Sequence, residues 1–135
     1  RDCHSLRDVV LPKNLLQIGV RAFFDCWQLK TIDFPDSVTR ICQQAFNGCH
    51  SLATVRLPQN LPVNISNDAF SNCPSLFHVE TPRLMPEVEQ NRIIDQLNRY
   101  NHPSFQYVGL NRMGRRVFLA TVPTLLFPRL ARSRL

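Results

Sequence analysis

Four cysteines recur in the sequence at intervals of 23, 23 and 24 residues: Cys3, Cys26, Cys49 and Cys73. Cysteines on neighbouring strands lie about 4.8 Å apart, which falls within the roughly 4.4 to 6.8 Å between Cα atoms that a disulfide spans. A buried cysteine at a repeated position is nevertheless most often an inert thiol that fills the core. We therefore expect buried thiols, with disulfides or a metal site as the alternatives.

Two histidines directly follow cysteines of this series, His4 and His50. They lie two intervals apart, about 10 Å on neighbouring strands, whereas two nitrogens bound to one zinc cannot be more than about 4.2 Å apart. We expect no shared zinc site. His78 and His102 have no cysteine or carboxylate at ligand or triad spacing, so we expect solvated or core histidines there.

Catalytic motifs are missing from the sequence. It contains no G-x-S-x-G, no H-E-x-x-H and no phosphate-binding glycine loop, and it has 4 glycines in all. We therefore expect no catalytic residue, no cofactor and no metal ion. Asn64-Ile65-Ser66 matches a glycosylation acceptor, but we treat the match as accidental because Ile65 occupies a repeated apolar position.

The cysteines belong to a longer repeat. Each is followed by leucine, by an aliphatic residue and by proline at three-residue steps, within the segments 3–12, 26–35, 49–58 and 73–82. The second half of each unit carries an aliphatic pair and then Ala-Phe, at Ala22-Phe23, Ala45-Phe46 and Ala69-Phe70. The single extra residue falls in Pro62-Val63-Asn64. A repeat of this period is typical of solenoid proteins.

This pattern resembles the BspA-type leucine-rich repeat over residues 3–82, about three and a half units. Phe34 and Thr81 stand where leucine or isoleucine is usual, and Cys42 stands where the first unit has Gly19. The resemblance implies a leucine-rich-repeat solenoid. This is a right-handed coil with a parallel β-sheet on one face and short strands or irregular returns on the other.

The residue pattern agrees with that architecture. Leu-x-x-Val-x-Leu places alternate side chains inward, as in a short strand, and the proline after it ends the pairing. Phe23, Phe46 and Phe70 recur at one position, so we expect them to stack as an aromatic spine inside the coil. No polar cap precedes Cys3, so we expect the first coil to be an open end or to pack on upstream repeats.

A change of pattern after Pro82 divides the chain into repeats at 1–82 and a C-terminal cap with a basic tail at 83–135. Pro86 and the acids after it predict a helix start, and Ile93, Ile94 and Leu97 lie at helical spacing. Residues 105–110 and 114–120 form two short elements of unassigned type. Pro123 opens a last predicted helix. We expect these helices to cover the C-terminal end of the coil.

The tail carries a second resemblance. Leu110 to Arg116, Val122-Pro123 and Leu126-Phe127-Pro128 are similar to a short tail that follows such repeats in some unicellular algal proteins. This similarity supports the family and implies no activity.

The net charge of +6 is confined to the tail. Residues 1–110 hold ten basic and ten acidic residues, so the surplus consists of Arg112, Arg115, Arg116, Arg129, Arg132 and Arg134. A basic segment with apolar residues at helical spacing binds acidic surfaces. No aromatic residue interleaves the arginines after Phe127, so stacking on bases is unsupported.

Outward positions of the predicted strands form the candidate protein-binding surface, which we call the sheet face: Asp8, Val10, Thr31, Asp33, Thr54, Arg56, His78 and Glu80. Asp33, Arg56 and Glu80 alternate in charge on adjacent strands. They form either a cross-strand charge ladder or a polar recognition strip.

The sequence thus predicts a non-catalytic protein-protein interaction module, monomeric and a fragment of a longer leucine-rich-repeat protein. The alternative is binding of nucleic acid or an anionic membrane through the arginine tail. The partner is not identified by these residues. The thiols favour an intracellular location, whereas a signal peptide upstream of Arg1 would place the protein at the cell surface or outside the cell.

Overall fold

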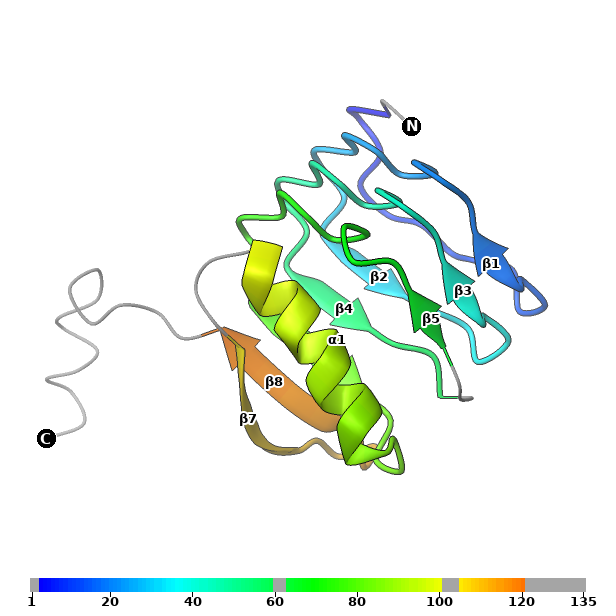
Figure 1. Ribbon diagram of the computed structural model, residues 1–135. Helices are drawn as coiled ribbons and strands as arrows, with labels where there is room; N and C mark the ends of the chain where they lie inside the picture. Colours follow the sequence, from blue (N-terminus) through cyan, green and yellow to red (C-terminus); the bar gives the residue numbers. More distant parts are fainter. Residues whose placement is uncertain (1–2, 60–62, 101–104, 121–135) are drawn as a thin grey trace, which may run out of the picture.

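The computed structural model describes residues 3–59, 63–100 and 105–120. Its repeats wind as stacked coils that form two sheets of short strands, with the first coil contributing to one of them (Figure 1). The return sheet consists of β1 (Gln17–Ile18), β3 (Arg40–Ile41) and β5 (Asn64–Ile65), in that order. The larger sheet has the order β2-β4-β6-β8-β7. Its repeat strands are β2 (Thr31–Asp33), β4 (Thr54–Arg56) and β6 (His78–Thr81), paired in parallel.

Strand register follows the repeat. Ile32 pairs with Val55 and Val55 with Val79, and all three side chains are buried. The residue before each interior cysteine adopts a positive φ, at Asp25, Gly48 and Asn72. Aspartate, asparagine and glycine tolerate this left-handed conformation best, so the repeat can turn sharply there and place the following cysteine in the core.

The aromatic spine is confirmed. Phe46 stacks on Phe23 with ring centroids 5.0 Å apart and on Phe70 at 5.1 Å, with interplanar angles of 9° and 7°. Phe34 meets Phe46 edge to face at 5.6 Å. Phe46 is fully buried, whereas Phe23 is only half-buried because it belongs to the first coil. Leu6, Val9, Leu11 and Leu15 of that coil are likewise partly exposed.

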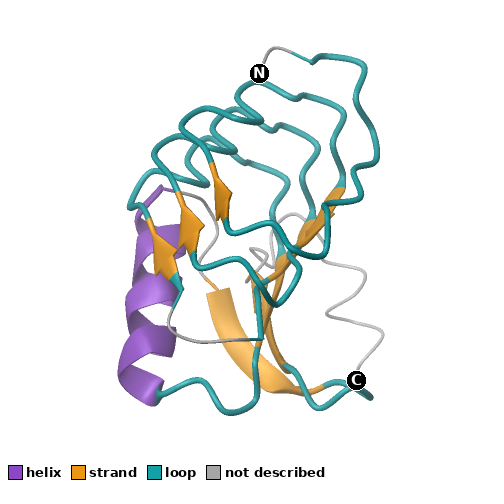
Figure 2. Ribbon diagram, turned by 90° about the vertical axis from the view of Figure 1, so that its right-hand side faces the viewer, coloured by secondary structure: helices purple, strands orange, loops and turns teal. Residues whose placement is uncertain are grey.

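The helix predicted to start at Pro86 is confirmed as α1 (Glu87–Tyr100), which lies across the last coil (Figures 1 and 2). Glu87 and Glu89 occupy its first turn and Arg99 its last, which complements the helix dipole. Ile93, Ile94 and Leu97 are buried against the repeats. No helix in the described part of the chain is long and apolar enough to cross a membrane.

Residues 105–120, whose two elements the sequence left unassigned, form a β-hairpin, so α1 is the only capping helix within the described residues. β7 (Phe105–Leu110) pairs with β8 (Arg116–Ala120), and β8 pairs antiparallel with β6. The cause is the open edge of β6, whose backbone groups have no further parallel strand to bind and accept β8 instead. Val117, Phe118 and Ala120 are buried in this position. The helix predicted after Pro123 lies outside the described residues.

Candidate functional site

The sheet face is a continuous surface in the structure. Thr31, Thr54 and His78 lie side by side in register, and Leu119 of β8 follows His78. Thr31 is exposed, whereas Thr54 and His78 are half-buried. Asp8 and Val10 are exposed but lie in the first coil, which forms no strand at these positions. They extend the surface beyond the hydrogen-bonded ladder.

Phe77 is an exposed aromatic side chain beside this row, and the sequence prediction did not include it among the site residues. It is 48% exposed and meets the His78 ring edge to face at 6.1 Å. Its N–H donates to the Ala53 carbonyl at 3.2 Å, and the Ala53 N–H donates to the Lys30 carbonyl at 2.8 Å. The sequence could have indicated this residue, because Phe77 directly follows the repeated leucine of its unit, as Lys30 and Ala53 do in the preceding units.

Glu80 is buried, which corrects its assignment to the open face. Its Oε2 accepts from Arg56 Nε at 3.1 Å and lies 2.9 Å from His78 Nε2. Its Oε1 accepts from Asn111 Nδ2 at 2.8 Å. Arg115 Nε lies 3.5 Å from the same oxygen, at ion-pair distance without a hydrogen bond. The β7–β8 turn, which carries Asn111 and Arg115, therefore covers this end of the charge ladder.

The predicted alternation of charge does produce a ladder. Arg56 contacts both Glu80 and Asp33, the latter at 3.7 Å. The Asp33 and Arg56 side chains are 64% and 42% exposed, and an exposed pair of this kind contributes about 0.2–1 kcal/mol. Glu80 and Arg115 are 4% and 7% exposed. A buried pair of this kind costs about 3–5 kcal/mol when one partner is removed.

The pKa values reflect this burial. Desolvation pushes the pKa of Glu80 upward, but the hydrogen bonds and charges of Arg56 and His78 outweigh it, so the pKa is lowered overall. Desolvation lowers the pKa of Arg115, and the charge of Glu80 opposes that effect. The hydrogen bond to Glu80 raises the pKa of Arg56. Glu80 is thus held as a carboxylate by its neighbours.

The basic tail is not one continuous patch. Arg115 is buried, and its guanidinium also donates to the Leu57 carbonyl. Arg116 is half-buried and donates to Gln90 Oε1 of α1. Arg112 is exposed at the hairpin turn. Arg129, Arg132 and Arg134 lie outside the described residues. The expectation that Arg115 contributes to a surface charge is therefore wrong.

The cysteines are thiols in the structure. Cys49 Sγ donates to the Phe23 carbonyl and Cys73 Sγ to the Phe46 carbonyl, each at 3.2 Å. Burial raises the pKa of Cys49 to about 12 and also raises those of Cys26 and Cys73. Cys3 is exposed, contrary to the expectation of burial, because no described coil packs on its side.

The histidines beside the cysteines are separated by an indole. Trp27 stacks on His4 at 4.0 Å and on His50 at 6.0 Å between ring centroids. The described residues contain no group of three or more metal-ligating side chains. This column forms a stack of exposed rings along the coils.

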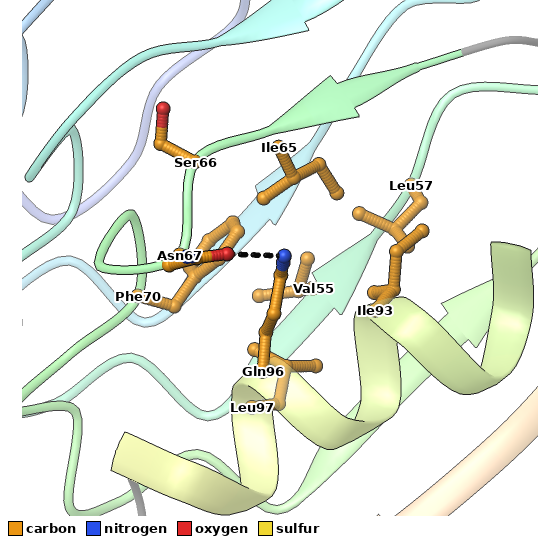
Figure 3. A pocket seen from close by; sticks show the side chains of 9 residues that line it. All are labelled: Val55, Leu57, Ile65, Ser66, Asn67, Phe70, Ile93, Gln96 and Leu97. Atoms are coloured by element: carbon orange, nitrogen blue, oxygen red, sulfur yellow. Dashed lines mark hydrogen bonds between the residues drawn. The ribbon is translucent and has the colours of Figure 1, made fainter.

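The seam between α1 and the last coil is closed. Figure 3 shows Ile93 and Leu97 of α1 facing Val55, Leu57 and Phe70, with Gln96 bonded to Asn67 at the rim. The Gln96 Nε2 to Asn67 Oδ1 distance is 2.6 Å. The cavity among these side chains measures about 10 Å³, which is hardly room for one water. The seam is therefore packing rather than a ligand site.

Two solved structures resemble the chain. The first is a leucine-rich cell surface protein from Faecalibacterium prausnitzii, with 30% identity and a TM-score of 0.60 over 67% of this chain and 23% of that one. The second is the leucine-rich repeat protein of T. pallidum, with 28% identity and a TM-score of 0.52. Its match covers 74% of this chain and 52% of that chain. No curated protein matches in sequence.

The family comparison agrees with the coil geometry. The model of the BspA type leucine rich repeat region matches residues 1–108 in 6 copies, which include α1 and part of the hairpin as well as the cysteine-aligned units. The stacked strands, the phenylalanine spine and the buried cysteines are the structural form of that repeat. The chain belongs to the BspA-type leucine-rich repeat family.

Proposed function

We propose that this chain is a non-catalytic protein-protein interaction module that binds its partner as a monomer through the sheet face. Leucine-rich repeat domains generally serve protein interaction, and solenoids of this type present extended surfaces to their partners. The observation that carries the proposal is the row Thr31, Thr54 and His78, an accessible and continuous set of side chains on paired strands.

Phe77 is the best candidate for an energetic centre of this surface. Aromatic anchors dominate binding energy when a partner buries them. Half of this ring is exposed, with Lys30 exposed and Ala53 half-buried in the same column. Asp33 and Arg56 add charges that orient a partner more than they hold it. Asp8 and Val10 extend the proposed surface into the first coil.

Binding of nucleic acid or an anionic membrane has less support. The surplus of arginines suggested it, but Arg115 is neutralised by Glu80 and Arg116 is engaged with α1. Electrostatic binding scales with the number of accessible cations, and the described tail offers Arg112 alone as an exposed arginine.

Site-specific photocrosslinking in the source cells tests the interaction surface. A benzophenone amino acid is placed at Thr31, at Thr54 or, as the control on the opposite sheet, at Gln17, which is also exposed. We expect Thr31 and Thr54 to capture the same protein and Phe77→Ala to reduce its yield. Capture of the same protein from Gln17 with equal yield, or of nucleic acid from all positions, contradicts the proposal.

A further inference from the structure

The return sheet ends in an unpaired edge at β5. In the coils before it, the Ile18 carbonyl accepts from the Cys42 N–H and the Ile41 carbonyl accepts from the Ser66 N–H, each at 3.0 Å. Ile65 is the next residue of that column. Within the described part of the chain, no hydrogen bond reaches its carbonyl. Alternation along a parallel strand points its N–H to the same edge.

A furrow runs along this edge. Two adjoining cavities of about 430 Å³ and about 380 Å³ share Asn64 and Arg92, and Ile65 and Ser66 line the larger one. The strand β5 forms one wall and α1 the other, with Gln96 of α1 meeting Asn67 across the end of the furrow (Figure 3). The furrow lies on the return side, away from the sheet face.

The walls of the furrow are lined mostly by side chains that can both donate and accept hydrogen bonds. Hydroxyls and amides predominate: Thr39, Gln43, Asn64, Ser66, Asn67 and Gln96. The charges are largely engaged, since Arg92 pairs with Glu89 at 2.8 Å and Asp68 Oδ1 accepts from the Gln44 N–H. A peptide group also carries one donor and one acceptor. Such walls suit an extended main chain better than a charged ligand.

Arg92 of α1 donates a hydrogen bond to a backbone carbonyl on this edge, where a following strand would otherwise donate one. Its guanidinium donates to the Val63 carbonyl at 3.5 Å, two residues before Ile65 on the same edge. The register of the earlier coils would place a backbone N–H of a following strand near these carbonyls. The edge thus has one carbonyl covered by a side chain and the next one open.

We propose that this furrow binds an extended peptide segment of another protein, which pairs with Ile65 and adds a fourth strand to β1-β3-β5. The peptide main chain supplies the bonds that a following coil would make, as in other cases of strand addition to an exposed edge. Its side chains are small or uncharged and polar where they meet the amide walls. β1 has an open edge too, but no helix of the described residues lies beside it to form a second wall.

The test uses a peptide with the sequence of residues 36–45 of this chain carrying Cys42→Ser, because the segment containing β3 natively pairs with the edge of β1 that corresponds to the open edge of β5. The probe is titrated into the full chain, and amide chemical shifts and hydrogen exchange are followed. We expect saturable shifts at residues 63–66 and 92–96 and slower exchange of the Ile65 amide. The same peptide carrying Cys42→Pro instead lacks the N–H that the register of β1 and β3 places on the Ile65 carbonyl, and it should bind at least about tenfold more weakly.

Two protein variants localise the binding. Asn64→Trp fills the furrow from an exposed position and should weaken binding about tenfold or more. Gln96→Ala removes one amide of the wall and should weaken it less. Lys30→Trp, at an exposed position directly before β2, is the matched control and should leave binding of the peptide unchanged.

Three results would overturn the proposal: no shifts at millimolar peptide, shifts confined to β1 or β7, or equal binding of the proline peptide. Each leaves the sheet-face function untouched, because the crosslinking experiment reports on the opposite side of the coil.

Discussion

Glu80 shows how one side chain can belong to the architecture although its repeat position suggests a surface role. Asp33 and Arg56 hold the equivalent positions on β2 and β4 and are accessible. Glu80 is covered because the hairpin turn brings Asn111 and Arg115 to its carboxylate. Glu80 therefore continues the charge ladder through Arg56 and also binds the hairpin turn through Asn111 and Arg115.

Acid should weaken the protein through this carboxylate. Because the pKa of Glu80 is lowered in the folded state, its stabilisation is present above the ordinary value of about 4.3 and is lost as the pH falls through the folded-state pKa. Glu80→Gln should lower the free energy of unfolding at pH 7 by about 3–5 kcal/mol. The free energy of unfolding of this variant should also fall less steeply at acid pH than that of the wild type. Urea denaturation at several pH values measures both effects.

Asp95→Asn, at an exposed position of α1, is the control for a carboxylate without a buried role. If it destabilises the chain as much as Glu80→Gln does at pH 7, the anchoring role of Glu80 is wrong.

Thiol reactivity should separate the cysteines into two groups. Cys3 is exposed and Cys42 half-buried, whereas burial raises the pKa of Cys49 to about 12 and that of Cys73 as well. The thiolate is the species that reacts. With iodoacetamide at pH 8 we expect prompt labelling of Cys3, slower labelling of Cys42, and none at Cys26, Cys49 or Cys73 until denaturant is added. Mass spectrometry of the peptides gives the pattern, and disulfides between neighbouring coils would contradict it.

The phenylalanine spine links the coils more strongly than any exposed pair does. Phe46 is fully buried between Phe23 and Phe70, with Phe34 at its edge. The three stacked rings of Phe23, Phe46 and Phe70 belong to three successive coils, so the stack joins each coil to the next. Loss of its middle member leaves a cavity that both neighbours line.

Phe46→Ala should therefore cost about 3–5 kcal/mol. Phe23→Ala, the matched change at the partly exposed end of the stack, should cost less, and Arg56→Ala less still. Thermal or urea unfolding of the three variants ranks them. If Phe46→Ala has the same unfolding midpoint as Phe23→Ala, the phenylalanine spine does not stabilise the stack as proposed.

The molecule as a whole is asymmetric at its two ends. The C-terminal end of the described stack is covered twice, by α1 over the core and by β8 along the edge of β6. The other end leaves Leu6, Val9 and Phe23 partly exposed. Coverage of the last coil should thus be a condition for folding, since a single coil cannot bury its own apolar face.

Truncation tests that condition. A chain that ends at Pro82 loses α1 and the hairpin, exposes Leu57, Ile65 and Phe70, and should aggregate or lose cooperative melting. A chain that ends at Ala120 keeps both elements and should still melt cooperatively. Circular dichroism and light scattering of the two proteins provide the comparison. Cooperative melting of the shorter chain at the same temperature would show that the cap is dispensable, and that residues 1–82 fold as the separate domain the sequence predicts.

The sequence by itself determined the repeat, its register and its core, because coil stacking is a local interaction that recurs with the period of the residues. Phe46, Cys49 and Ile32 are buried for reasons visible in the spacing. Residues 105–120 were different. Their short apolar pattern fits several structures, and only the unpaired edge of β6, a feature of the assembled stack, selected a strand. The same contact buried Glu80 and Arg115, which lie 35 residues apart, so their roles were decided by tertiary structure alone.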